Sequence, residues 1–173
     1  NVVVGDEAGT AITTGDNNTF MGYAAGDATT TGNSNTAIGR LALSTNTTGA
    51  ENTAVGVNAL YLATTGTFNV AIGNSAGGAV TTGIQNTLIG GLAGDSLTDA
   101  DYNVAVGHSA LDADTLGSRS VAVGTHALTS QNFTSATSTY NVAVGFEAGA
   151  AVTTGTNNTI IGGLSGDAIT TGS

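Results

Sequence analysis

The 173-residue sequence contains no cysteine, no proline and no tryptophan, and only 8% of its residues are charged. Without cysteine, the chain has neither disulfide bridges nor thiolate metal sites. Arg40 and Arg119 are its only Lys or Arg residues, and the formal net charge is −10. Nucleic acids and anionic membrane surfaces bind patches of Lys and Arg, so this balance argues against both as partners. No apolar run approaches the roughly 20 residues that cross a bilayer, which argues against membrane insertion.

The residues that are abundant indicate an ordered chain of narrow composition. There are 27 glycines, 40% of the residues are apolar, and Thr, Ala and Asn supply much of the remainder. A disordered chain would combine low apolar content with high charge, and this sequence has the opposite balance.

A short phrase, Asn followed by three small or β-branched residues and then Gly, returns along the whole sequence. It occurs in ten copies, with Ser120 in place of the Asn in one of them. The closing glycines are 17 residues apart, except for a gap of 21 between Gly124 and Gly145. A fixed short period indicates one structural unit stacked on copies of itself. Each repeat is numbered here from position 1, its Asn, to position 17.

The repeat predicts an all-β fold, a parallel β-solenoid of ten 17-residue coils. Positions 2 to 4 favour a short strand because they carry mostly Val, Ile and Thr. Glycines at positions 5 and 15 suit the corners and disfavour a helix. At the strand spacing of about 4.7–4.9 Å, ten coils make a rod about 45–50 Å long. We expect residues 1–173 to form one domain, a slice of a longer fibre.

The Asn at position 1 is expected to form a ladder along the rod, each amide bonding the coils above and below it. The alternative is that each Asn only caps its own turn. The residues of this predicted ladder are Asn1, Asn18, Asn35, Asn52, Asn69, Asn86, Asn103, Asn141 and Asn158.

Position 3 is apolar in every copy, although it points to the opposite side of the strand from positions 2 and 4. Strands that are apolar on both faces are normally covered on both. We therefore expect position 4 to carry the core of the coil and position 3 to contact another chain. The predicted contact residues are Val3, Phe20, Ala37, Ala54, Ala71, Leu88, Ala105, Ala122, Ala143 and Ile160.

The phrase N-[TV]-A-[IV]-G-x-x-A, present at Asn35, Asn52, Asn69, Asn103 and Asn141, resembles the head repeat of YadA-type trimeric autotransporter adhesins. It is also similar to Asn-Thr-Ala repeats of phage-type tail fibres. The resemblance covers the whole chain. It implies a left-handed β-roll assembled as a homotrimer.

The regular pattern weakens between about Ser96 and Tyr140, and the four extra residues fall within 131–139. We expect them to form a loop that leaves the stack as a tolerated bulge or, alternatively, carries binding. Asp95 and Asp112 share position 10 of adjacent coils, where a Ca²⁺ ion would relieve their repulsion. The alternative is a solvated acidic patch, so Asp95 and Asp112 are a weak metal candidate and no cofactor is expected.

Aromatic residues at position 17 suggest a ligand-binding column. Phe68, Tyr102 and Tyr140 occupy this position in every second coil and could stack on sugars or on a protein. The alternative is that they shield a turn. No catalytic motif accompanies them, so we do not expect an enzyme.

The sequence thus favours a structural, non-enzymatic shaft or head segment of an extracellular, cell-surface or virion fibre that serves adhesion or surface attachment. A first alternative is an extracellular filament subunit that polymerises end to end through exposed solenoid edges. A second is a glycan-binding module. The expected partners are copies of the same chain and a cell-surface receptor or glycan.

Overall fold

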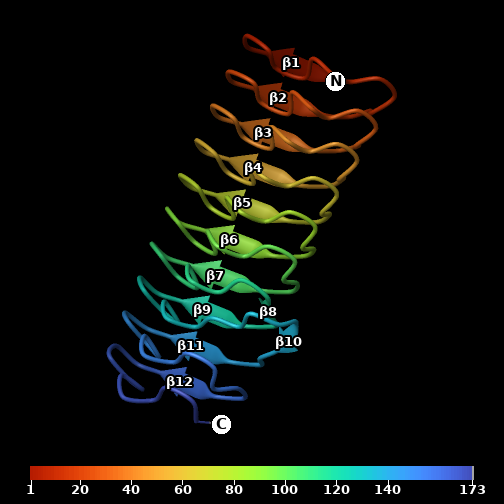
Figure 1. Cartoon of the computed structure of the whole chain (residues 1–173). Coiled ribbons are helices and arrows are strands. Elements are labelled where there is room, and N and C mark those ends of the chain that lie inside the picture. The colour runs from red at the N-terminus through yellow and green to blue at the C-terminus, as the bar shows by residue number, and fades with distance from the viewer. Residues whose placement is uncertain (173) are drawn as a thin grey trace.

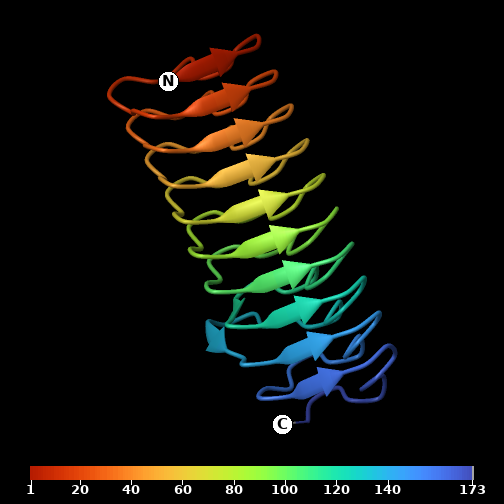
Figure 2. The ribbon, with the colours of Figure 1, turned by 180° about the vertical axis from the view of Figure 1, so that it is seen from behind.

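Each repeat forms one coil, and the coils stack into a single rod with the two termini at opposite ends (Figures 1 and 2). The computed structural model describes residues 1–172. Within this range every regular element is a β-strand, and none is a helix. The predicted parallel β-solenoid of 17-residue coils is confirmed.

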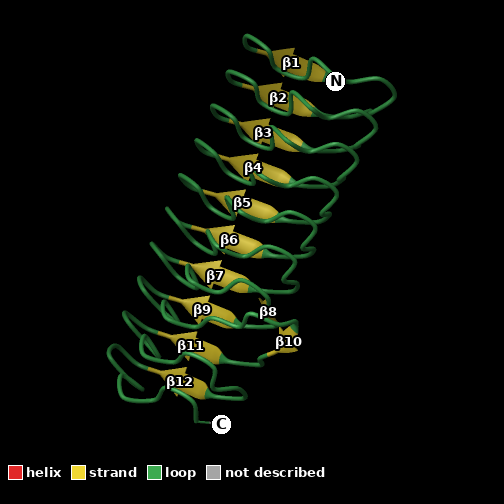
Figure 3. Cartoon of the chain, viewed as in Figure 1, coloured by secondary structure: helices red, strands yellow, loops and turns green. Residues whose placement is uncertain are grey.

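Ten strands, one per coil, build a parallel sheet along one side of the rod, while loops and turns complete each coil (Figure 3). Their register follows the repeat, so that Ala54 pairs with Ala71 and Ala122 pairs with Ala143. A second, two-stranded parallel sheet joins β8 to β10. The strands are β1 (Val2–Val4), β2 (Thr19–Met21), β3 (Thr36–Ile38), β4 (Thr53–Val55), β5 (Val70–Ile72), β6 (Thr87–Ile89), β7 (Val104–Val106), β8 (Gly117–Ser118), β9 (Val121–Val123), β10 (Thr137–Ser138), β11 (Val142–Val144) and β12 (Thr159–Ile161).

The glycine at position 5 ends each three-residue strand. At Gly39 the φ angle is +136°, and a Cβ atom there would overlap the carbonyl oxygen of Gly56 in the next coil. The corner after it turns through left-handed residues at positions 7 and 9, such as Asn58 and Leu60. Left-handed backbone is unfavourable for side chains other than Gly, so packing must hold these residues in place.

The core is a narrow space inside the coil, filled from positions 3, 8, 9 and 12. Phe20 at position 3 fills it in the second coil, where position 9 is Gly26, and a Cβ on Gly26 would come within 2.6 Å of the Phe20 ring. In the fourth coil Ala54 at position 3 leaves room for Leu60 at position 9, and both are fully buried. No coil carries a large residue at both positions. A large residue at one of these two positions therefore takes space that the small residue at the other leaves open.

Threonine at position 13 binds the next coil with two groups. The backbone N–H of Thr64 and its hydroxyl both donate to the carbonyl oxygen of Thr81, at 2.9 and 3.2 Å. The same pair of bonds recurs in the neighbouring coils, for example from Thr47 to Thr64. This column continues the coil-to-coil hydrogen bonding outside the strands.

Candidate interaction surface

The side of the sheet that faces away from the coil is formed by positions 2 and 4. On β5, Ala71 at position 3 is 0% exposed, whereas Ile72 at position 4 is 39% exposed. The prediction that position 3 contacts another chain is wrong, because these side chains lie inside the coil. From Phe20 to Ile160 all of them are buried: Phe20, Ala37, Ala54, Ala71, Leu88, Ala105, Ala122, Ala143 and Ile160. Val3, in the first of the described coils, is 42% exposed.

The prediction that position 4 carries the core of the coil is also wrong. The interior of a 17-residue coil is too narrow for a Val or Ile on the strand opposite a Leu from position 9. An Ala at position 3 leaves that space, and the larger β-branched residues therefore face outward. The signal was present in the sequence, since every Leu at position 9 shares its coil with an Ala at position 3.

We call this outward surface, positions 2 and 4 of the ten strands of the large sheet, the outer sheet face. Neither position carries a charged residue in any copy. Nine strand spacings of about 4.8 Å and a strand length of about 10 Å give it an area of about 430 Å². Its exposed apolar members are Val2, Val4, Met21, Ile38, Ile72, Ile89, Val144 and Ile161. This area is similar to that of the largest apolar patch on an ordinary monomer, and such patches often bind a partner.

The asparagines at position 1 lie in one column beside this face, most of them buried within the stack. Asn69 Nδ2 donates to the carbonyl oxygen of Gly83 in its own coil at 2.8 Å. Asn69 Oδ1 accepts from the backbone N–H of Asn86 in the next coil at 3.0 Å. The amides also bond each other, as from Asn86 Nδ2 to Asn69 Oδ1 at 3.1 Å. Each side chain thus joins its own turn to the following coil, which combines the two predicted roles.

Ser120 interrupts the asparagine column, and Gln131 bridges the gap. Gln131 Nε2 donates to the Ser120 hydroxyl at 2.8 Å and to Asp114 Oδ2 at 2.6 Å. Its Oε1 accepts from Asn141 Nδ2 at 2.8 Å, which connects this coil to the next one. Burial raises the pKa of Asp114, while hydrogen bonds from its neighbours oppose that shift.

The four extra residues of this coil stay close to the stack. The carboxylate of Asp114 accepts from the backbone N–H of Phe133 at 2.9 Å, and the Phe133 side chain is buried. The chain then pairs again as β10, with Thr137 opposite Gly117. Buried contacts therefore hold part of the segment that was expected to leave the stack.

The three aromatic residues at position 17 are exposed, each in a left-handed backbone conformation. The guanidinium of Arg119 lies 4.9 Å from the centre of the Tyr102 ring and donates to the hydroxyl of Ser138 at 2.9 Å. Arg119 therefore covers one face of the Tyr102 ring. Phe68 and Tyr140 lie in other coils of the column.

Asp95 and Asp112 lie on adjacent coils, as their shared position requires. Burial raises the pKa of Asp95, with the negative charge of Asp112 as a second cause. The carboxylate of Asp112 accepts from the hydroxyl of Thr129 at 2.8 Å. Among residues 1–172 no group of three or more His, Cys, Asp or Glu side chains is placed to hold a metal ion.

Comparisons with known proteins add no relative to this description. No family model, no curated protein and no solved structure matches the chain. In the part of the chain that the structure describes, no helix has the length and apolar character of a membrane span.

Proposed function

We propose that this chain is a non-enzymatic structural segment of an extracellular or virion fibre, assembled as a homotrimer and serving adhesion or surface attachment. The observation that carries the proposal is the outer sheet face. It has no charged residue in any of the ten coils, position 4 is apolar throughout, and position 2 is Val or Thr. When two such surfaces come together, both are removed from water, and the free energy of the system falls.

The dimensions of the outer sheet face limit how strongly two copies of this chain associate through it. About 430 Å² on each copy corresponds to about 860 Å² for one pair, which is below the roughly 1,000 Å² of a stable specific interface and in the range of a weak one. The strict register of the strands places equal side chains at equal heights along the rod. Two parallel copies can therefore align coil by coil without gaps.

The number of chains rests on the resemblance of the Asn-Thr-Ala-Ile-Gly phrase to trimeric adhesin heads and tail fibres. In a three-chain arrangement, position 2 of one copy would face position 4 of the next around a shared axis. The asparagine column and the threonine column would then give each rod its axial cohesion.

Sedimentation equilibrium of the purified chain tests this proposal. We expect a species of three times 16.7 kDa for the unchanged chain. Ile72→Glu and Val106→Glu together place six carboxylates inside a trimer, where unpaired charges cost several kcal/mol each. This double variant should sediment as a folded monomer. Thr65→Glu adds one carboxylate per chain at an exposed residue outside the strands and should leave the trimer intact.

Three results would contradict the proposal. A monomeric unchanged chain at all concentrations would show that the outer sheet face binds no second copy. A trimer that survives both glutamates would place the contact elsewhere. Long polymers in place of a discrete trimer would favour the filament, in which the open ends of the solenoid bind each other.

A further inference from the structure

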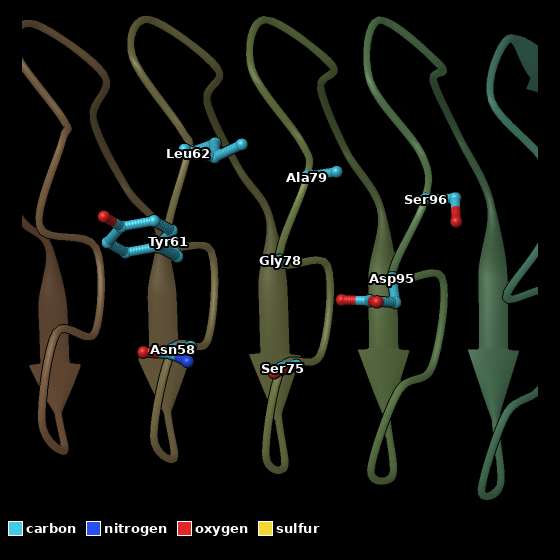
Figure 4. A pocket seen from close by; sticks show the side chains of 8 residues that line it. All are labelled: Asn58, Tyr61, Leu62, Ser75, Gly78, Ala79, Asp95 and Ser96. Atoms are coloured by element: carbon cyan, nitrogen blue, oxygen red, sulfur yellow. The ribbon is translucent and has the colours of Figure 1, made fainter.

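A depression lies on the return side of the coils, away from the strands of the large sheet. Figure 4 shows its lining side chains on the segments that pass in front of the strands. Tyr61 and Leu62 border it on the fourth coil, and Asp95 borders it on the sixth. Its volume is about 350 Å³. That lies at the lower end of the range for small-molecule sites.

The depression exists because small residues separate large ones at positions 10 and 11. The fifth coil has Gly78 and Ala79 where the fourth has Tyr61 and Leu62. Since equivalent positions stack directly, the missing side chains leave a gap about two strand spacings, or about 9.6 Å, between the bordering coils. Only the fourth coil carries Tyr and Leu at positions 10 and 11, so this border occurs once along the chain.

The two borders differ in chemistry. Tyr61 and Leu62 are apolar and are 36% and 41% exposed. Across the gap, the carboxylate of Asp95 lies above Gly78, where an added Cβ would be 2.6 Å from its Oδ1 atom. Burial raises the pKa of Asp95. A partly desolvated carboxylate gains more from a hydrogen bond than a fully solvated one.

Polar groups also close one end of the depression. The Asn58 amide lines it there, and Figure 4 shows the amide nitrogen on the side nearer to Ser75. The Oδ1 atom of Asn58 is buried without a partner and, in Figure 4, lies on the side away from the depression. A ligand in the depression can therefore accept a hydrogen bond from the Nδ2 atom but cannot reach Oδ1.

We propose that this depression binds one pyranose ring of a neutral saccharide. The C–H face of the ring packs on Tyr61 and Leu62. Hydroxyl groups on its rim donate to the Asp95 carboxylate and accept from the Asn58 amide. An apolar border opposite a polar one matches a ring that has one apolar face and a polar rim. The volume suits a single ring.

A cationic ligand fits this arrangement less well. Tyr61 is the only aromatic residue of the lining, so no cage of rings surrounds a cation there. None of the exposed aromatics at position 17 lines this depression, and Arg119 already covers one face of the Tyr102 ring. The saccharide site is therefore assigned to Tyr61 and not to Phe68, Tyr102 or Tyr140.

Saturation-transfer NMR with methyl glycosides of glucose, mannose, galactose and N-acetylglucosamine tests the site, with Nα-acetyl-lysine amide as the cationic probe. We expect at least one glycoside to bind with a dissociation constant of about 1 mM, as for other small ligands of this size. Tyr61→Ala should weaken binding about tenfold. Asp95→Asn should weaken it at least about tenfold. Tyr61→Phe should leave binding unchanged, because in Figure 4 the hydroxyl of Tyr61 points away from the depression.

Ala79→Leu fills the depression and should abolish binding, whereas Ala28→Leu makes the same change at position 11 of the second coil and should not. The site lies away from the outer sheet face, so the double-glutamate monomer should bind the same glycoside. The experiments can thus contradict the proposed trimer without contradicting the proposed saccharide site, and the reverse. The proposal is overturned if no glycoside binds, if only the lysine probe binds, or if Tyr61→Ala and Ala79→Leu leave binding unchanged.

Discussion

Asn69→Ala removes one step of the asparagine column in the middle of the rod. The Asn69 side chain is fully buried. It donates to the carbonyl oxygen of Gly83 at 2.8 Å and accepts from the backbone N–H of Asn86 at 3.0 Å. Both partners belong to the backbone and cannot move away without disturbing their coils.

The cost of this change follows from the two groups left without partners. A buried donor or acceptor that loses its hydrogen bond costs about 1–3 kcal/mol. Two such groups give a loss of about 2–6 kcal/mol in the free energy of unfolding. This is a large share of the total stability of about 5–15 kcal/mol that is usual for a domain.

Denaturant unfolding followed by circular dichroism measures this loss. Asn74→Ala is the matched control, since Asn74 is an exposed residue of the same coil. It should change the free energy of unfolding by no more than about 0.5 kcal/mol. Equal effects of the two variants, or a loss below 1 kcal/mol for Asn69→Ala, would refute the view that the column holds the coils together.

Two further predictions concern buried positions. Because burial raises the folded-state pKa of Asp114, its favourable contribution is complete below the unfolded pKa of about 3.9 and is lost as the pH rises through the folded pKa. The free energy of unfolding of Asp114→Asn minus that of the unchanged chain should therefore increase between pH 4 and pH 7, and a pH-independent difference in urea titrations would contradict this. Ala71→Glu places an unpaired carboxylate inside the coil and should unfold its neighbourhood, whereas Ile72→Glu should keep the native circular dichroism spectrum. A native circular dichroism spectrum for both Ala71→Glu and Ile72→Glu would mean that the inner and outer sides of β5 are wrongly assigned.

The sequence was sufficient for the fold because its period, strand residues and corner glycines all point to the same coil. The 17-residue spacing sets the stack, and Gly39 illustrates why position 5 excludes any side chain. These signals are local or repeat at fixed intervals, so they need no knowledge of tertiary packing.

The inner and outer sides of the strand were assigned wrongly because both carry apolar residues. Only the pairing of Ala54 with Leu60, and of Phe20 with Gly26, shows which side shares space with position 9. The depression beside Tyr61 was missed for a different reason. It depends on what three successive coils carry at positions 10 and 11, which becomes visible when the repeats are read as columns.

Maleimide labelling of single-cysteine variants tests most directly whether the outer sheet face binds another copy. The chain has no cysteine of its own, so each introduced thiol reports on one site. Ile89→Cys lies on the outer sheet face, and Thr65→Cys lies at an exposed residue outside the strands. The account predicts that Ile89→Cys is protected in the native protein and labelled after the two glutamates are added, while Thr65→Cys reacts in both. Equally rapid labelling of both cysteines in the native protein would contradict it.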